Sequence, residues 1–249
     1  GTSGKDTLIG NNFNNILEGG AGDDYLDGGD GKDTVSYINA INNVDNKGVI
    51  VNLGSDEYNI KKGEASGIDG IDQLWNFENV IGSNYDDTIK GNSLENTLFG
   101  AKGNDTLSGG LGDDYLDGGE GNDTVDYSSS NSSQFVHLGL GEASGGEGND
   151  TIVNIENVIG TRFNDTIYGN NENNILDGGL GDDTIFGEAG DDTLLGKSGN
   201  DTLSGGLGDD YIDGGVGNNT ASYEYIQTGR VTVYLSKSAQ QDTINAGLD

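Results

Sequence analysis

The chain has 249 residues, of which 43 are acidic and 11 basic, so its formal net charge is −32. This balance argues against a nucleic acid partner, because binding to phosphates needs a basic surface. The absence of cysteine excludes disulfides. No apolar run approaches the about 18 residues of a membrane-spanning helix, so we expect no membrane span.

Taken in chain order, three blocks of a nine-residue repeat alternate with longer spacers. From position 178 to 222 five repeats follow one another without an insertion, and each reads Gly-x-x-Gly-x-(Asp/Asn)-x-apolar-x. This nonapeptide is typical of parallel β-helical solenoids. The predicted segments are block 1 (1–36), spacer or cap (37–81), block 2 (82–126), spacer or cap (127–159), block 3 (160–222) and a partial spacer (223–249).

The repeat at 205–213 illustrates the expected local structure. Its first six residues must turn tightly, which glycine allows because it reaches positive φ without steric conflict. The last three residues form a short strand, so Ile212 should point inward while Tyr211 and Asp213 point outward. Aliphatic residues at position eight should therefore stack into a buried column, and we predict an all-β fold.

The sixth position of the repeat carries the candidate metal ligands. Carboxylates stacked at the strand spacing of about 4.8 Å repel each other unless a cation lies between them. An oxygen-only ligand set suits a hard divalent ion with flexible geometry, which indicates several bound Ca²⁺ ions. The predicted ligands are Asp6, Asp24, Asp33, Asp87, Asp105, Asp114, Asp123, Asp165, Asp183, Asp192, Asp201 and Asp210.

In this pattern the chain resembles the calcium-binding parallel β-roll of the RTX (repeats-in-toxin) proteins. The resemblance implies that two repeats make one coil and that each ion lies between a loop and the loop two repeats later. The implied pairs of aspartates are 6/24, 87/105, 105/123, 165/183, 183/201 and 192/210. Pairs that include an asparagine are 15/33, 96/114, 174/192 and 201/219, and these sites should be weaker because each has one carboxylate fewer.

The spacers share a pattern of their own. Each contains an alternating strand, at 49–53, 136–140 and 231–235, and the first two close with the similar segments 72–81 and 150–159. Leu74, Phe77, Val80 and Ile81 are predicted to plug the open end of the next roll, since solenoids need capping segments. The second repeat of every block has Asn at position six, which we interpret as a capping coil without a strong ion site.

Other residues have competing interpretations. Fifth-position Asp residues are expected in solvent. Asp72 with Glu78, and Asp150 with Glu156, form either an additional ion site or turn caps. The only histidine, His137, lies in an alternating strand and is interpreted as a surface residue. The chain has no zinc-binding HExxH motif and no Gly-x-Ser-x-Gly motif, so we expect no enzymatic activity within it.

The resemblance implies a role for the chain. It would be a Ca²⁺-dependent folding and spacer module of a larger toxin, adhesin or enzyme. The type I secretion machinery of a Gram-negative bacterium would export that protein, which would act in the extracellular space or at the cell surface. Two alternatives are an accessory module of a secreted protease, lipase or alginate epimerase, and an adhesin segment that binds a cell-surface glycan.

Overall fold

A computed structural model describes residues 1–41, 46–54, 62–222, 229–234 and 243–245, the last two ranges for their backbone alone. Every regular element among these residues is a β-strand, and none of them forms a helix that could cross a bilayer. The chain divides into two compact units, one containing residues 1–124 with 150–155 and the other residues 125–149 with 156–249.

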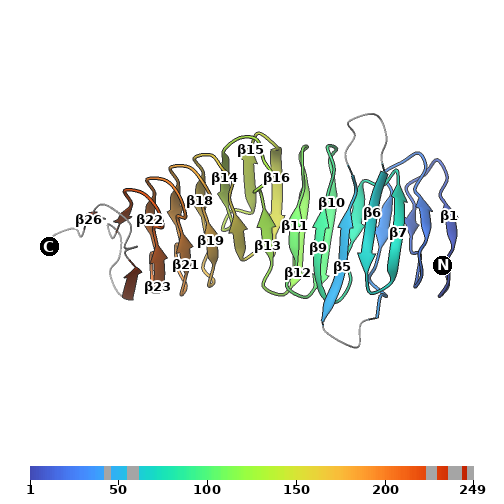
Figure 1. The fold of residues 1–249 in the computed structure, drawn as a ribbon, viewed down its shortest axis with the longest axis horizontal. Coiled ribbons are helices and arrows are strands. Elements are labelled where there is room, and N and C mark those ends of the chain that lie inside the picture. Colours follow the sequence, from blue (N-terminus) through green and yellow to red (C-terminus); the bar gives the residue numbers. More distant parts are fainter. Residues whose placement is uncertain (42–45, 55–61, 223–228, 235–242, 246–249) are drawn as a thin grey trace. The chain divides into compact units, whose positions relative to one another are not determined.

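The first unit contains two sheets whose strands lie side by side (Figure 1). In hydrogen-bonded order, one sheet contains β1 (Thr7–Ile9), β3 (Tyr25–Asp27), β7 (Gly70–Trp75), β6 (Lys62–Gly67), β5 (Lys47–Asn52), β9 (Asp86–Lys90) and β11 (Thr106–Ser108). The other contains β2 (Ile16–Leu17), β4 (Thr34–Ser36), β8 (Asn79–Ile81), β10 (Thr97–Lys102), β12 (Tyr115–Glu120) and β16 (Gly148–Val153).

The second unit also contains two sheets. One contains β13 (Thr124–Asp126), β17 (Asn157–Ile159), β19 (Ile175–Asp177), β21 (Thr193–Leu195), β23 (Gly208–Asp213) and β25 (Gly229–Tyr234). The other contains β15 (Glu142–Gly145), β14 (Gln134–His137), β18 (Thr166–Tyr168), β20 (Thr184–Phe186), β22 (Thr202–Ser204), β24 (Thr220–Ser222) and β26 (Thr243–Asn245).

The register of the repeat strands fixes the size of one coil. Thr184 pairs with Thr202 and Thr193 pairs with Tyr211, in both cases between parallel strands. Partners are thus 18 residues apart, and consecutive strands alternate between the two sheets. The prediction of a parallel β-roll is confirmed.

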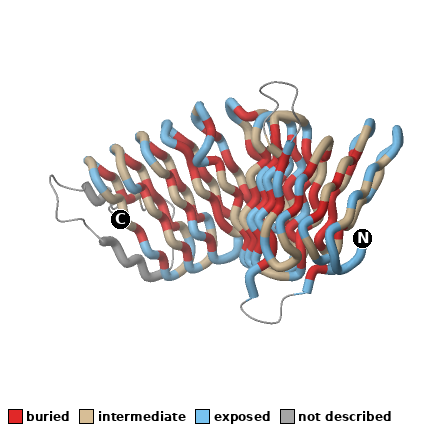
Figure 2. Tube along the Cα trace, turned by 45° about the vertical axis from the view of Figure 1, so that its right-hand side comes forward, coloured by how far each residue is buried: buried red, intermediate tan, exposed pale blue. Residues whose placement is uncertain are grey.

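The core consists of the eighth-position side chains, in two columns rather than one. Leu176, Leu194 and Ile212 pair along one sheet of the second unit, and each is at most 1% exposed. Ile167 and Ile185 belong to the opposite column. As predicted, Ile212 is buried while Tyr211 is 36% exposed. Figure 2 shows the buried positions recurring along each coil.

The spacers are built into the roll. Their predicted alternating strands correspond to β5, β14 and β25, although β14 ends at His137, where a turn begins, and residue 235 lies outside the described residues. β5 and β14 each pair antiparallel with a further strand, β6 and β15. Strand β8, which contains Val80 and Ile81, pairs with β4 on one side and β10 on the other. Val80 therefore continues the core of the first unit and Ile81 is half-buried beside it, instead of plugging an end as expected.

Candidate metal-binding loops

The sixth-position aspartates form ladders of charge-assisted hydrogen bonds. The backbone NH of Asp165 donates to Oδ1 of Asp183 at 2.8 Å, and the NH of Asp183 donates to Oδ1 of Asp201 at 2.9 Å. The structure connects all ten predicted pairs in this way, including the four that contain an asparagine, over 2.7 to 3.1 Å. In each pair, one oxygen of the later side chain is thereby fixed by the backbone NH of the earlier loop.

The second oxygen of most of these carboxylates is buried without a hydrogen-bond partner. Burying a polar atom without a partner costs about 1–3 kcal/mol, and more for a charged group. A native fold normally supplies each such atom with a partner. Within the part of the chain that the structure describes, the unpartnered Oδ2 atoms include those of Asp24, Asp105, Asp114, Asp183, Asp192, Asp201 and Asp210.

Three aspartates, one in the first repeat of each block, differ. Oδ2 of Asp87 accepts the NH of Ser83 at 2.6 Å, and Oδ2 of Asp165 accepts the NH of Thr161 at 2.6 Å. Asp6 accepts the NH of Thr2, which lowers the pKa of Asp6. In each case the residue four positions earlier also donates its hydroxyl. The sequence analysis did not identify this role of the second-position Ser or Thr.

Backbone carbonyls line the same loops. A Cβ built on Gly160 would lie 2.6 Å from the carbonyl oxygen of Gly178 and 2.8 Å from Oδ2 of Asp165, so no side chain fits at this first position. At the second position, Gly179 has a φ of +92° and faces the carbonyl oxygen of Thr161. Carboxylate and carbonyl oxygens thus meet in loops two repeats apart, and this donor set fits a hard cation such as Ca²⁺.

The aspartates do not gather in larger clusters. Across the described ranges, no group of three or more acidic, histidine or cysteine side chains could hold a metal ion. The carboxylates instead follow one another singly along each ladder. Any ion between two loops would therefore need backbone carbonyls for most of its ligands.

Burial strongly perturbs the titration of the ladders. Desolvation is the main cause, and neighbouring carboxylates add to it for most members, while the donated backbone NH groups oppose it. It raises the pKa of Asp105 and Asp183 to about 8 and the pKa of Asp114 and Asp192 to about 7. The pKa of Asp87 and Asp201 rises to about 6, and burial also raises the pKa of Asp165 and Asp210. Without a cation, the carboxyl groups of Asp105, Asp114, Asp183 and Asp192 therefore hold protons near neutral pH.

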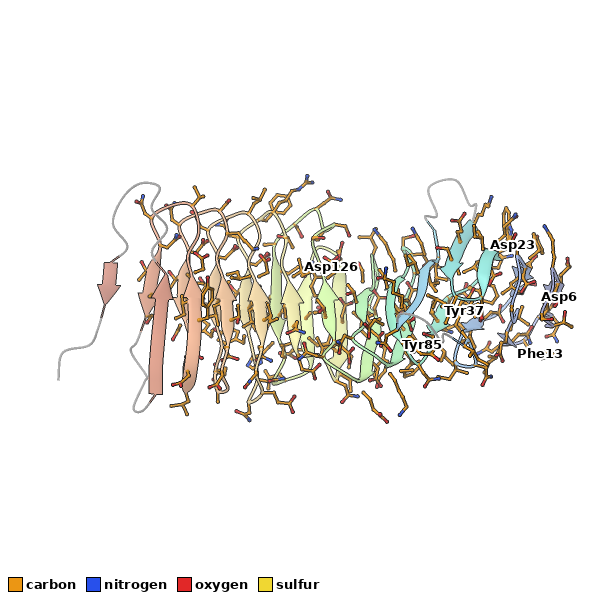
Figure 3. All side chains as sticks on the ribbon, turned by 60° about the horizontal axis from the view of Figure 1, so that its bottom comes forward. Asp6, Phe13, Asp23, Tyr37, Tyr85 and Asp126 are labelled. Atoms are coloured by element: carbon orange, nitrogen blue, oxygen red, sulfur yellow. The ribbon has the colours of Figure 1, made fainter. Side chains whose placement is uncertain are left out.

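Fifth-position residues form a second ladder that the sequence analysis missed. Asp182 is exposed, as expected, yet its Oδ1 accepts the NH of Asn200 at 2.7 Å, and the NH of Asp182 donates to Asn164 at 3.0 Å. Here the side chain accepts from the following loop, whereas the sixth-position side chain accepts from the preceding one. Asp23 likewise lies at the surface, where it accepts the NH of Ile71 (Figure 3).

Two of the second-repeat asparagines, Asn96 and Asn174, use both halves of their amide. The side chain of Asn174 donates to the carbonyl oxygen of Glu156 at 2.8 Å and accepts the NH of Asn170 at 2.8 Å. Asn96 donates to the carbonyl oxygen of Glu78 at 2.8 Å in the same way. A carboxylate could not donate, so the structure gives a reason for Asn at these positions.

The spacers contribute carboxylates of their own to the ladders. Oδ1 of Asp72 accepts the NH of Asp24 at 2.9 Å, and an oxygen of Glu78 accepts the NH of Asp33 at 2.9 Å. Asp72 is thus joined to Asp24, and Glu78 to Asp33. In the second spacer, Oδ1 of Asp150 accepts the NH of Asp114 at 3.0 Å. The sequence could have predicted the roles of Asp72 and Asp150, because the segments 67–75 and 145–153 that contain them also read Gly-x-x-Gly-x-Asp-x-apolar-x.

A comparison with protein-family models matches the RTX calcium-binding nonapeptide repeat, in four copies, to residues 1–35, 91–125, 143–153, 155–185 and 186–221. These segments make up more than half of the chain. The chain belongs to the RTX family. It is thus a calcium-binding β-roll module, as its sequence predicted, and the RTX match at 143–153 includes the repeat around Asp150. No curated protein matches this RTX chain significantly.

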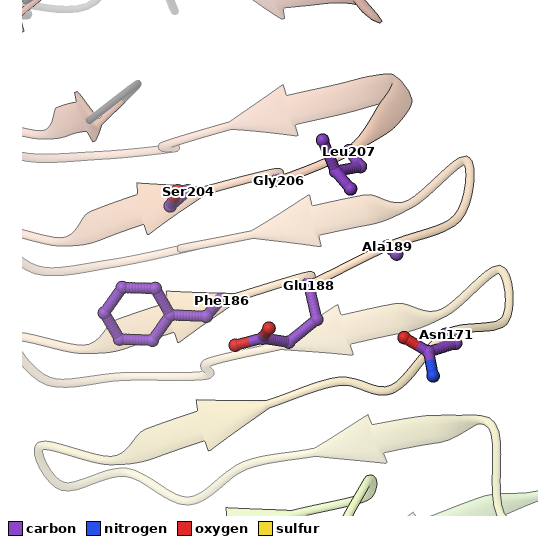
Figure 4. A pocket seen from close by; sticks show the side chains of 7 residues that line it. All are labelled: Asn171, Phe186, Glu188, Ala189, Ser204, Gly206 and Leu207. Atoms are coloured by element: carbon purple, nitrogen blue, oxygen red, sulfur yellow. The ribbon is translucent and has the colours of Figure 1, made fainter. Parts of the chain in front are cut away.

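The aromatic side chains of the second unit form a stack beside a shallow pocket. The ring of Tyr168 lies 5.0 Å from that of His137 and 4.7 Å from that of Phe186, with nearly parallel planes. Glu188 is the only titratable side chain among the residues that line the pocket, which are Asn171, Phe186, Glu188, Ala189, Ser204, Gly206 and Leu207 (Figure 4). An acid–base pair is thus lacking in this pocket. The glycan-binding and enzyme-accessory alternatives stay predictions.

Proposed function

We propose that the chain is a calcium-driven folding module in which pairs of sixth-position aspartates, two repeats apart, bind Ca²⁺. The proposal is carried by the buried, unpartnered Oδ2 atoms of these aspartates. A bound Ca²⁺ ion would give these Oδ2 atoms, and the carbonyl oxygens beside them, the positively charged partner that they lack. The pairs 6/24, 87/105, 105/123, 165/183, 183/201 and 192/210 would bind most strongly, and the four mixed pairs more weakly, because affinity depends on ligand charge.

The energetics favour folding only when ions are present. Without a counter-charge, each buried carboxylate either stays ionised or takes up a proton on folding, and either outcome opposes the native state by several kcal/mol near neutral pH. Domain stability is only about 5–15 kcal/mol in total, so several such groups together outweigh it. Ion binding then supplies the folding free energy, as in other small metal-dependent domains. The chain itself would act as a structural spacer and carry no catalytic group.

We further propose that this dependence serves export. The membership in the RTX family and the strongly acidic composition support a chain that stays unfolded at low Ca²⁺ inside a Gram-negative bacterium. After type I secretion it would fold outside, as part of a larger secreted or surface protein. Extracellular calcium modules have Kd values of about 10⁻⁴–10⁻³ M, which suits such a switch. Folding outside removes the unfolded form and so favours outward transport.

Circular dichroism tests the proposal directly. In excess chelator at neutral pH the chain should give a disordered far-UV spectrum, and Ca²⁺ should convert it cooperatively to β-structure. Mg²⁺ at the same concentration should act far less well, because it demands a small octahedral site and gives up water reluctantly. A chelated sample that already has the full β-spectrum would overturn the proposal.

A further inference from the structure

We infer that the pocket of Figure 4 binds a neutral sugar ring of a glycan, held against the end of a row of stacked aromatic rings. This ligand site goes beyond the proposed function, because it uses none of the aspartate ladders. Its side chains lie outside the core, on the outer face of one sheet of the second unit.

The aromatic row consists of His137, Tyr168 and Phe186, on the neighbouring strands β14, β18 and β20. His137 pairs with Tyr168, and Tyr168 pairs with Phe186, between parallel strands. The ring centroids are 5.0 and 4.7 Å apart, and the ring planes differ by only 17° and 13°. These distances match the spacing of neighbouring strands, about 4.8 Å, so the roll itself holds the rings face to face.

The aromatic row ends at Ser204, the residue of β22 that pairs with Phe186. Tyr168 covers one face of the Phe186 ring, and the small side chain of Ser204 leaves room beside the other face. Phe186 and Ser204 both line the pocket, whose volume of about 460 Å³ is within the range of small-ligand sites, about 300–1,000 Å³. A further flat ring, placed one strand spacing along, would therefore continue the row.

Two polar side chains of this pocket lack a partner. Ser204 is 8% exposed, yet its hydroxyl forms no hydrogen bond to another described residue. Burial of a hydroxyl without a partner is unfavourable, so a ligand that bonds to it is favoured. Glu188 is exposed, its carboxylate forms no ion pair or hydrogen bond within the same part of the chain, and it extends toward the ring of Phe186 (Figure 4).

The backbone at Glu188 also sets this residue apart. Its φ is +76°, in the left-handed region, where the same position two repeats later is Gly206 with a φ of +102°. A side chain in this region is strained, and such residues cluster at ligand sites. Lys197 has a similar conformation, with a φ of +65°, but forms an ion pair with Asp177 at 3.2 Å. The carboxylate of Glu188 is left for a ligand.

A neutral hexose matches this arrangement of groups. One face of its ring presents C–H groups, which the electron-rich face of Phe186 attracts, while its hydroxyls project from the edge toward Glu188 and Ser204. An acidic sugar or a phosphate would be repelled by Glu188 and by the net charge of −32. An aromatic side chain of a partner protein could fill the gap, but it would leave both polar groups unpaired.

The first unit has a comparable groove without these features. Phe99 and Asp117 line it and pair with each other, as the two residues at the end of the aromatic row do. Ala101 replaces the glutamate, and Oδ1 of Asp117 already accepts the side-chain amide of Asn154 at 2.8 Å. On the other side Phe99 pairs with Ile81, so no stacked row leads to this groove. It serves as an internal control.

A glycan array tests the inference on protein that circular dichroism shows to be folded, so the result does not depend on which cation folds the chain. The array carries neutral oligosaccharides of glucose, galactose and mannose, and sialylated and sulfated oligosaccharides as acidic probes. The wild-type chain should retain neutral glycans in preference to acidic ones. Isothermal titration calorimetry then gives the Kd of each glycan that is retained.

Ser204→Phe is the sharpest variant, because a fourth ring would fill the gap and displace the sugar while the row stays intact. Phe186→Ala removes the stacking surface instead. Both should raise the Kd at least about tenfold, whereas the control Phe99→Ala should leave it within about twofold. Glu188→Ala should raise the Kd at least about fivefold. The fold tolerates alanine there, since Ala101 has a φ of +84° at the equivalent position.

A folded wild-type chain that retains no neutral glycan would overturn the inference. An equal Kd for wild type and folded Ser204→Phe would also overturn it, because the sugar would then lie elsewhere. If Ser204→Phe does not fold, an unchanged Kd in the exposed variant Glu188→Ala decides against the site. N-acetyltyrosinamide is titrated in the same way, and saturable binding of this amide without any glycan binding would assign the gap to a protein partner. None of these results bears on the aspartate ladders, so the proposed function is tested separately.

Discussion

Acidification should substitute in part for calcium, because the folded ladders bind protons that the unfolded chain does not. A folded pKa of about 7 to 8, above the ordinary value of 3.8, is shared by Asp105, Asp114, Asp183 and Asp192. A raised folded pKa means that stability is fully present below the unfolded pKa and is lost as the pH rises through the folded pKa. The folded chain without calcium should therefore gain stability when the pH falls from 7 to 5.

The magnitude follows from the difference in bound protons. Over two pH units, each of the four groups adds about 2.5 kcal/mol if it is protonated only in the folded state. Screening by solvent near the loops reduces this to about 1 kcal/mol each, or about 4 kcal/mol for the four groups. This is a large part of a typical domain stability of about 5–15 kcal/mol.

The assay is folding in excess chelator, followed by circular dichroism while a stabilising osmolyte is added. At pH 5 the midpoint should occur at a clearly lower osmolyte concentration than at pH 7. The chain remains soluble there, because its isoelectric point is about 4.1. A midpoint that is equal at both pH values, or higher at pH 5, would refute the reasoning about buried carboxylates.

Three further predictions test individual positions. Asp183→Asn should raise the Ca²⁺ concentration needed for folding by at least about tenfold, because a buried ladder carboxylate is lost. The control Asp182→Asn, at the exposed neighbour, should leave that concentration within about twofold of the wild-type value. Equal midpoints of the two variants in a calcium titration would contradict the assignment of Asp183 as a ligand. Gly22→Ala should destabilise the calcium-loaded chain by about 1–3 kcal/mol, since Gly22 has a φ of +129° and a Cβ would lie 2.8 Å from the carbonyl carbon of Gly4. Gly4→Ala, where a Cβ meets nothing within 4 Å, should be near neutral in the same urea denaturation. Asn174→Asp should lower stability by about 1–3 kcal/mol instead of creating a better ion site, because Asp cannot donate to the carbonyl oxygen of Glu156; a gain of one ion in a dialysis count would show the opposite.

The repeats could be predicted from sequence because their period and geometry are local. Position eight of every repeat is apolar and position six carries Asp or Asn, so the inward direction of Ile212 and the spacing of Asp183 and Asp201 followed directly. The size of the coil came from the resemblance to RTX proteins. The register of Thr184 against Thr202 then agreed with it.

The spacers could not be predicted to the same depth. Their antiparallel pairs depend on contacts between strands that have no fixed period, and β6 contains the Gly-rich segment at 62–67, which is weakly strand-forming. A shared Glu-Ala-Ser-Gly segment at 64–67 and 142–145 was a signal for β6 and β15. The hydrogen-bond partner of Asp72 could not be predicted either, because Asp24 is distant in sequence and only the fold brings the two residues together, whereas Glu78 is near in sequence. The roles of Thr161 and Asn174 required hydrogen-bond geometry that the repeat pattern does not encode.

The short spacing between paired strands has a consequence for folding kinetics. Parallel sheets usually fold slowly, because distant segments must meet before any contact forms. Here most strands meet a partner only 18 residues away, so the mean sequence separation of contacts is small. We expect coils to form rapidly once ions arrive, each extending from its neighbour. The two spacers, with their longer loops, should be the slow steps at which growth pauses.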